Sequence, residues 1–220
     1  KSASGKLILM LKYISNNYYS EYILLKIKDH NFILSPNKTI FWQNKSILLI
    51  SDLHVGGKKS LSTTEIISNF ERAIAEFDLK EIIILGDLFD ATCTITNRNI
   101  FSEFLRSIDL KMTLILGNHD KLPQEEYLEL GISTVTPEMT IDMFILTHKP
   151  VNSNQHNIHG HLHPGLYKRN ILIKNRLPCF VVQEDSICLP AFGGITGKNK
   201  YSTNSQRQVY IIKNNLIKLS

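Results

Sequence analysis

The first half of the chain alternates between short apolar runs and stretches in which apolar residues recur at helical spacing. The runs at 47–50, 82–85 and 113–116 are aliphatic at nearly every position, which is typical of strands buried on both faces. Apolar residues recur every three or four positions over 63–77 and again around 100–105, which predicts two helices. This alternation predicts a parallel sheet whose strands are joined by right-handed crossovers.

Strands predominate on either side of that region. Apolar runs at 22–28 and 32–34 predict a hairpin, and 39–42 predicts a further strand. A short helix is expected at 123–130. Beyond it we expect a second, mostly antiparallel sheet packed on the first, and residues 193–208 are polar enough to predict a mobile surface loop. The strands of this second sheet are expected at 143–147, 170–173, 180–183, 187–189 and 208–218.

The composition supports one globular domain. The chain has 220 residues, of which 43% are hydrophobic and 20% are charged, so it is large enough to bury a full core. We expect residues 22–220 to form a single domain, preceded by an N-terminal extension of residues 1–21. The formal net charge of +5 suits a polyanionic partner such as nucleic acid. A Lys- and Asn-rich composition that reflects genome bias is an equal alternative.

The cysteines and the apolar runs bear on the compartment. Cys93, Cys179 and Cys188 show no C-x-x-C spacing, which argues against a thiolate zinc site and favours a reducing, cytoplasmic location. Cys179 and Cys188 flank a predicted hairpin and could pair, although two buried thiols are the favoured alternative. No apolar run approaches the ~20 residues that a membrane-spanning helix needs, so we expect no membrane association.

Polar side chains follow the buried strands, each at the point where a strand ends. Because the carboxyl ends of parallel strands meet at one edge of a sheet, we expect these side chains to gather there. Side chains alternate along an extended chain, so Asp52 and His54 are expected to point the same way, as are His161 and His163. The groups are Asp52 and His54, Gly86-Asp87, Asn118-His119-Asp120, His148, and Gly160-His161-Leu162-His163.

The combination of imidazole and carboxylate groups indicates a metal site. Such a mixed set suits first-row divalent transition metals better than Ca²⁺ or Mg²⁺. Without a metal, so many titratable groups in one crevice would cost repulsion and desolvation. Each group alone is typical of an ordinary strand-end turn, but an ordered set of five favours metal binding.

The same series resembles the signature of the calcineurin-like metallophosphoesterases. The resemblance rests on Asp52-x-His54, Gly86-Asp87, Gly117-Asn118-His119-Asp120, His148 and Gly160-His161-x-His163, and it spans about half of the chain. It implies an α/β fold, a four-layer αββα sandwich of two mixed sheets flanked by helices. It also implies a two-metal-dependent phosphodiesterase that hydrolyses phosphate ester bonds. The implied cofactors are two divalent transition metals, with Mn²⁺ favoured and Fe or Zn as alternatives.

The resemblance also implies a role for each residue. The first metal would be held by Asp52, His54 and His163, with Asp87 bridging, and the second by Asn118, His148 and His161. His119 would sit over the leaving group as a catalytic acid, and Asp120 would orient and charge its imidazole. The alternative for Asp120 is a helix N-cap ahead of Pro123.

A narrower resemblance points to DNA repair. Residues 40–42, 48–58, 159–164 and 189–197 are similar to bacterial DNA ligase-associated metallophosphoesterases, although Gly56 and Gly57 stand before Lys58 where one glycine is usual. Segment 59–64 is also shorter than usual. The similarity implies a phosphodiester substrate in DNA or nucleotides and a functional association with a DNA ligase and a helicase. Alternatives are a phosphatase or pyrophosphatase for a small nucleotide and a non-catalytic scaffold of the same fold.

A few further residues are candidates for substrate contacts. Lys58 and Lys59 follow the first group and could hold a substrate phosphate, with solvated lysines as the equal alternative. His159 directly precedes Gly160 and could contact the substrate or support the ligands. His30 in the hairpin turn and His156 in a polar segment are expected on the surface.

Overall fold

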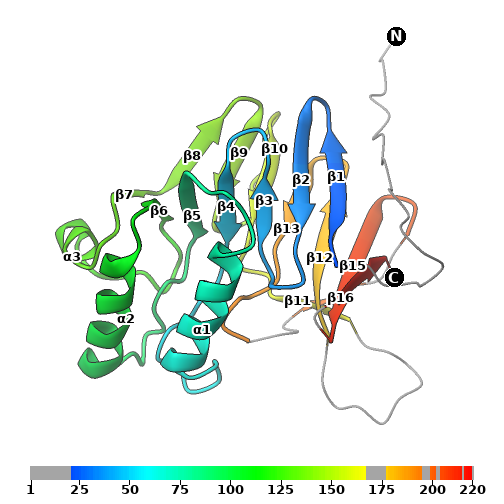
Figure 1. Ribbon diagram of the computed structural model, residues 1–220. Coiled ribbons are helices and arrows are strands. Elements are labelled where there is room, and N and C mark those ends of the chain that lie inside the picture. The colour runs from blue at the N-terminus through cyan, green and yellow to red at the C-terminus, as the bar shows by residue number, and fades with distance from the viewer. Residues whose placement is uncertain (1–20, 167–176, 195–198, 202–203, 215, 220) are drawn as a thin grey trace.

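The computed structural model describes residues 21–166, 177–194, 199–201, 204–214 and 216–219 (Figure 1). The strand predicted at 170–173 and nearly all of the N-terminal extension lie outside these residues.

The first sheet has seven strands in the order in which they occur in the chain. The predicted parallel unit is confirmed, since β4 to β7 run parallel to one another, while β1 to β4 are antiparallel neighbours. β4 and β5 are aliphatic because both faces are covered, one by the second sheet and the other by helices. The strands are β1 (Ile23–Ile27), β2 (His30–Leu34), β3 (Ile40–Trp42), β4 (Ile47–Ile50), β5 (Glu81–Leu85), β6 (Lys111–Ile115) and β7 (Thr134–Thr136).

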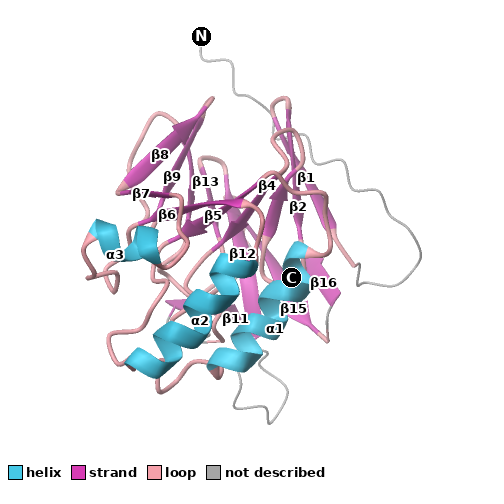
Figure 2. Cartoon of the chain, turned by 60° about the vertical axis from the view of Figure 1, so that its left-hand side comes forward, coloured by secondary structure: helices cyan, strands magenta, loops and turns pink. Residues whose placement is uncertain are grey.

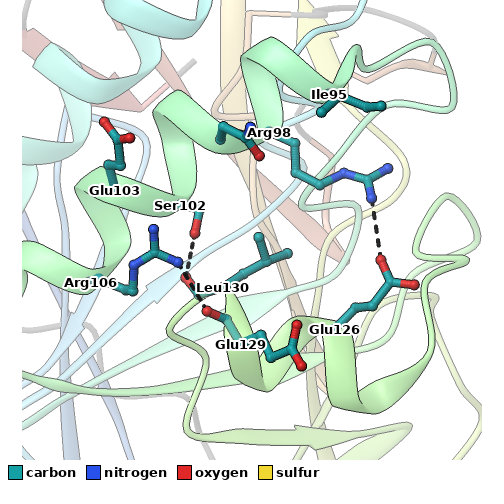
Figure 3. Close-up of a pocket in the computed structure, with 9 residues that line it drawn as sticks. Ile95, Arg98, Ser102, Glu103, Arg106, Glu126, Glu129 and Leu130 are labelled. Atoms are coloured by element: carbon teal, nitrogen blue, oxygen red, sulfur yellow. Dashed lines mark hydrogen bonds and ion pairs between the residues drawn. The ribbon is translucent and has the colours of Figure 1, made fainter.

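Helices join the parallel strands. α1 (Thr63–Ile74) begins with a capping box in which the Ser62 hydroxyl accepts a hydrogen bond from the Glu65 backbone N–H. α2 (Ile95–Ser107) starts five residues earlier than its apolar spacing predicted, because its first turn is exposed and mostly polar. α3 (Gln124–Glu129) is short and follows Pro123. Arg98 and Arg106 of α2 bond Glu126 and the Glu129 carbonyl, so the two helices are docked together (Figure 3).

The second sheet is mixed. Its order is β14-β11-β12-β13-β10-β9-β8, and β15 pairs with β12 and β16. Antiparallel pairs predominate as predicted, but β9, β10 and β13 are parallel neighbours. β10 escaped prediction because its residues His156, Asn157 and His159 are polar although buried. The strands are β8 (Glu138–Ile141), β9 (Phe144–Thr147), β10 (His156–His159), β11 (Pro164–Leu166), β12 (Leu177–Gln183), β13 (Ser186–Cys188), β14 (Asn199–Lys200), β15 (Arg207–Lys213) and β16 (Leu216–Leu219).

The core is organised in layers. Side chains of both sheets form one apolar cluster between them, which includes Phe32, Trp42, Phe144 and Phe180. A second cluster joins the first sheet to its helices, and α1 and α2 lie side by side over that sheet (Figure 2). Burying a side chain of this size contributes about 1.5–3 kcal/mol to the free energy of folding. The two mixed sheets are thus confirmed, and the three helices in the described part of the chain all cover the outer face of the first sheet.

The cysteines on the second sheet are free thiols. Cys179 and Cys188 are buried in a small cluster with Val181 and Val209. The favoured alternative, two buried thiols, is confirmed, and the disulfide is wrong. Among the described helices, none has the length and apolar character needed to cross a bilayer.

Two histidines expected on the surface pack against aromatic rings instead. The Trp42 indole N–H donates to His30 Nδ1 at 3.1 Å, and the His30 ring lies 5.0 Å from that of Phe144. His156 is 5% exposed, and its ring also packs edge-on against Phe144, with the ring centroids 5.6 Å apart. Both surface expectations are therefore wrong, because β2 begins at His30, before its apolar run, and His156 belongs to β10, whose polar sequence did not predict a strand.

We expect acid to destabilise the fold through His156. Burial lowers the pKa of His156 to about 4, below the unfolded value of 6.5, so the unfolded state binds more protons as pH falls between these values. One pKa unit corresponds to about 1.4 kcal/mol, so His156 should remove roughly 3 kcal/mol of stability between pH 7 and pH 4. Urea unfolding of metal-free wild type and His156→Leu at both pH values measures this, and equal losses in the two proteins would contradict it.

Candidate metal centre

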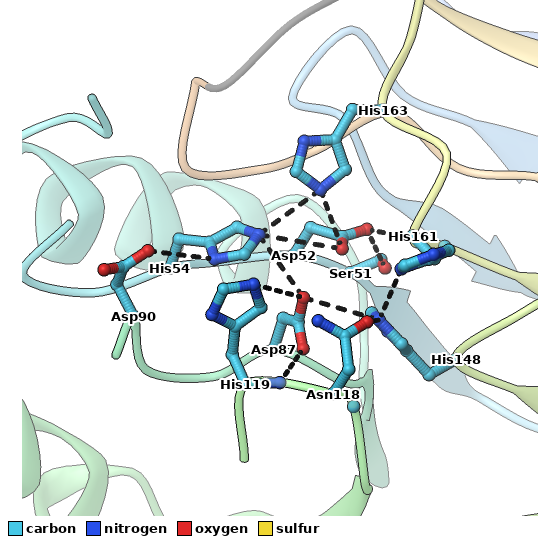
Figure 4. Close-up of polar contacts among 12 residues, drawn as sticks. Ser51, Asp52, His54, Asp87, Asp90, Asn118, His119, His148, His161 and His163 are labelled. Atoms are coloured by element: carbon cyan, nitrogen blue, oxygen red, sulfur yellow. Dashed lines mark hydrogen bonds and ion pairs between the residues drawn. The ribbon is translucent and has the colours of Figure 1, made fainter. Parts of the chain in front are cut away.

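Five loops converge at one end of the sheets (Figure 4). Three follow β4, β5 and β6 of the first sheet, and two follow β9 and β10 of the second sheet. The predicted gathering of side chains is therefore present, but it draws on both sheets. All seven of the expected metal ligands lie in this cluster: Asp52, His54, Asp87, Asn118, His148, His161 and His163.

The backbone of these loops is strained. Five of the expected ligands have a positive φ, between 43° and 66°. The left-handed region costs a residue other than glycine about 1–3 kcal/mol and is retained mainly at functional sites. Asp52 and His54 lie in the same site, as do His161 and His163, but the extended chain from which this was predicted is wrong for both pairs, because all four residues are left-handed. The N–H groups of Asp52 and His54 instead donate to the carbonyls of Gly86 and Asp87, which holds the turn in place. The five residues are Asp52, His54, Asp87, His161 and His163.

Buried groups from two loops, those after β4 and β10, form the first half of the cluster. His163 Nε2 lies 3.0 Å from Asp52 Oδ1 and 3.3 Å from His54 Nε2. None of these three side chains is more than 1% exposed. Burial lowers the pKa of His54 to about 4, against the opposing charges of Asp52 and Asp87, so its ring is neutral at pH 7 and retains a lone pair for a cation.

The second half of the cluster surrounds His148. Its Nε2 lies 3.2 Å from Asn118 Oδ1 and 3.1 Å from His161 Nδ1. His148 Nδ1 is 2.9 Å from the Leu85 carbonyl, which can only accept a hydrogen bond. Nδ1 therefore carries a proton. Burial lowers the pKa of His148, but its hydrogen bond with Asp87 and the charges of Asp52 and Asp87 raise it overall, so a cation at Nε2 would take the place of a second proton.

Asp87 joins the two halves. Its Oδ1 accepts the His119 backbone N–H at 2.8 Å. Its Oδ2 is left to face His54 Nε2 at 3.5 Å and His148 Nε2 at 3.4 Å. Burial raises the pKa of Asp87, but its hydrogen bond with His148 and the surrounding positive charge lower it overall to about 2. The group is thus an anion placed between two sets of nitrogen ligands.

Asp52 is held in the same manner. Its Oδ2 accepts the Ser51 hydroxyl at 2.5 Å and the His161 N–H at 2.9 Å, so Oδ1 is the oxygen that faces His163. Sequence reasoning missed Ser51, whose only signal was its place directly before Asp52. Each carboxylate therefore presents one oxygen to the cluster and ties the other to a neighbouring ligand loop.

The donor set fits two divalent cations. Two pairs of ring nitrogens face each other, His148 Nε2 with His161 Nδ1 at 3.1 Å and His54 Nε2 with His163 Nε2 at 3.3 Å. Each pair can share at most one proton, and without that proton the two lone pairs repel. Cations between them would remove this repulsion, and imidazole with carboxylate and amide oxygen suits first-row divalent metals. The residues present thus match the group that the family resemblance implies.

Residues 45–206 match the calcineurin-like phosphoesterases. The chain belongs to this family. It is a metal-dependent hydrolase of phosphate esters, and the family implies a binuclear divalent metal centre.

Two solved structures are similar to this phosphoesterase. The crystal structure of the Pseudomonas putida nuclease MPE has a TM-score of 0.80 and 29% sequence identity, covering 90% of this chain and 100% of that chain. A protein of unknown function from Aquifex aeolicus, AQ665, has a TM-score of 0.43 and 19% identity over 56% of this chain and 81% of that one. A sequence comparison with curated proteins finds no match.

His119 lies on the accessible side of the phosphoesterase site. Its ring is 5.0 Å from that of His54, and its Nε2 is 4.0 Å from Asp87 Oδ2. The side chain is 30% exposed, whereas Asp87 is nearly covered. His119 therefore stands where a substrate can reach it, with Asn118 and His161 also half-buried.

The expected role of Asp120 is corrected. Its Oδ2 accepts the N–H groups of Asp87 and Gly117 at 2.8 Å, and its Oδ1 accepts that of Leu88 at 3.0 Å. Both oxygens are thus directed at the backbone and not at the His119 ring. The N-cap alternative is also wrong, because Pro123 holds the N-cap position of α3. Asp120 instead ties the Asp87 loop to the Asn118 loop.

The other candidates separate into buried and exposed groups. His159 is 3% exposed, and its Nδ1 donates to the Gly160 carbonyl at 3.0 Å. The substrate contact expected for His159 is therefore wrong, and the alternative of ligand support fits its position. Lys58 and Lys59 are exposed beyond the His54 loop. Sequence reasoning also missed Asp90, three residues after Asp87, whose Oδ2 faces His54 Nδ1 at 3.6 Å.

Gly160→Ala should disrupt the centre by overpacking. A Cβ at Gly160 would lie 1.6 Å from Ser51 Oγ and 2.5 Å from Asp52 Oδ2, so the ligand loops must move apart. We expect a loss of about 1–3 kcal/mol in stability and clearly weaker Mn²⁺ binding by calorimetry. Adding Ser51→Ala should recover part of the binding, since it removes the nearest clash. Mn²⁺ binding by Gly160→Ala equal to wild type would contradict the tight packing.

Proposed function

We propose that this phosphoesterase is a Mn²⁺-dependent nuclease that hydrolyses phosphodiester bonds in DNA, in a repair process shared with a DNA ligase and a helicase. The observation that carries the proposal is the similarity to the Pseudomonas putida nuclease, which extends over all of that chain and 90% of this one. The resemblance of segments 159–164 and 189–197 to ligase-associated phosphoesterases supports the repair context. A ligase gene beside the gene of this protein would support it further.

Lysines around the site support a polyanionic substrate. Lys58 and Lys59 follow the loop of His54, Lys121 follows that of His119, and Lys149 directly follows His148, and all four are exposed. The pKa of His161 is lowered mainly by burial and by the charge of His148, and the charge of Lys149 lowers it further. The Lys149 charge therefore lies near the second half of the centre. Positive charge on several sides suits a chain with phosphates beyond the one being cleaved.

The proposal assigns each group a role. Two cations bound here would neutralise charge on a phosphate ester and lower the pKa of water. Asp87 presents a single oxygen to both halves and would help to hold both cations, and Ser51 and the N–H of His161 hold Asp52 in its orientation. His119 donates a proton to the leaving oxygen from the accessible side. The first cation would be held by Asp52, His54, His163 and Asp87, and the second by Asp87, Asn118, His148 and His161.

A substrate panel tests the assignment. In the presence of Mn²⁺, we expect the chain to cleave a single-stranded oligonucleotide and an activated aryl phosphodiester faster than a phosphomonoester or a small nucleotide pyrophosphate. Asp87→Ala should abolish all of these activities because it removes the oxygen that faces both halves. Cleavage of the phosphomonoester alone would replace the nuclease proposal with a phosphatase. Parallel assays with Fe²⁺ and Zn²⁺ test the metal.

His119→Asn should reveal a general acid through its leaving-group dependence. Loss of an acid costs ~10²–10⁴-fold where the leaving oxygen needs a proton, as in an oligonucleotide. An aryl diester leaves without that proton, so its hydrolysis should fall far less. Equal losses of kcat on the two substrates would count against an acid role for His119.

Removing the charges of Lys58 and Lys59 should weaken only extended substrates. For Lys58→Ala with Lys59→Ala, we expect a higher KM for an oligonucleotide and a salt dependence reduced by about one unit of slope per lost contact. The aryl diester should be unaffected. The matched control is Lys26→Ala with Lys80→Ala, two exposed lysines outside the ligand loops. Identical behaviour of the two double variants would favour solvated lysines.

A further inference from the structure

The two ring nitrogens of His54 have different surroundings. Nε2 faces the metal cluster, 3.3 Å from His163 Nε2 and 3.5 Å from Asp87 Oδ2. Nδ1 is buried on the opposite side of the ring and has no hydrogen-bond partner among the described residues. The group it faces is Asp90, whose Oδ2 lies 3.6 Å away (Figure 4). Nothing in the roles assigned above uses this carboxylate.

Asp90 is itself held in place. Its Oδ1 accepts the Thr92 N–H at 2.9 Å and the Thr92 hydroxyl at 2.7 Å. The Cys93 N–H donates to the Asp90 carbonyl, and the turn continues into Thr94, the N-cap of α2. Because both donors of Thr92 use Oδ1, the free oxygen of Asp90 is Oδ2, the one directed at His54.

The tautomer of His54 decides whether it can bind a cation. A neutral imidazole carries one proton, and a ligand nitrogen must offer a lone pair. Nε2 can therefore ligate only if Nδ1 carries the proton. A carboxylate can only accept a hydrogen bond, so a facing carboxylate favours that tautomer. The Leu85 carbonyl has the same effect on His148 in the other half of the centre.

We propose that Asp90 is a positioning residue that holds His54 in the Nδ1–H tautomer and so prepares the first metal position. The competing assignment is that Asp90 serves His119, whose ring lies 5.0 Å from that of His54. The distance to His54 Nδ1 favours His54. The proposal concerns the metal centre alone and does not depend on which phosphate ester is the substrate.

Asp90→Asn tests the proposal with metal binding as the readout. The donors of Thr92 keep the amide oxygen on their side, so the amide NH₂ faces Nδ1 and favours the tautomer that cannot ligate. In a calorimetric titration of metal-free protein with Mn²⁺, we expect one of the two sites to weaken by ~10–100-fold, the usual cost of losing such a partner. The other site should be unchanged. Asp109→Asn, an exposed carboxylate outside the ligand loops, is the matched control.

Asp90→Ala separates positioning from a merely structural role. It removes the acceptor without introducing a donor, so it should weaken the same site less than Asp90→Asn does. A larger loss with alanine, or equal weakening of both sites together with a lower Tm of the metal-free protein, would mean that Asp90 only supports the turn and would overturn the proposal. Unchanged Mn²⁺ affinity with a new leaving-group dependence would assign Asp90 to His119 and also overturn it.

Discussion

Lone pairs of buried imidazole and carboxylate groups converge within 3.0–3.5 Å of one another at the end of two sheets. Such an arrangement is unfavourable by itself, because the groups are removed from water and several of them repel. It becomes favourable when divalent cations occupy the spaces between the lone pairs. Much of the remaining architecture serves to hold these groups in place against that repulsion.

The restraint comes from bonds between loops. Each of the two ligand carboxylates ties one oxygen to the N–H of a residue in another ligand loop, Asp52 to His161 and Asp87 to His119. Asp120 binds three backbone N–H groups of two loops. Gly117 and Gly160 lie so close to neighbouring side chains that a Cβ would not fit. This network stabilises the left-handed backbone of five ligands, which the local sequence alone would not favour.

Much of this could be predicted from the sequence, for identifiable reasons. β4, β5 and β6 were predicted because continuous aliphatic runs are typical of strands buried on both faces, and the polar residues after them are where the ligands lie. β10 was missed because its buried residues are polar, and so the burial of His156 and His159 was missed with it. The directions of the Asp52 and His54 side chains were predicted for an extended backbone, whereas both residues have a left-handed backbone conformation. The contacts of Asp120 and Asp90 depend on loops that meet only in the folded protein, which spacing along the chain does not encode.

The central claim is that Asp87 joins two adjacent cation positions, one formed with Asp52, His54 and His163 and the other with Asn118, His148 and His161. The most direct measurement is the anomalous scattering of crystals grown with Mn²⁺. The account predicts two peaks about 3.5–4 Å apart, with Asp87 Oδ2 next to both. A single peak, or two peaks that do not share Asp87, would contradict it.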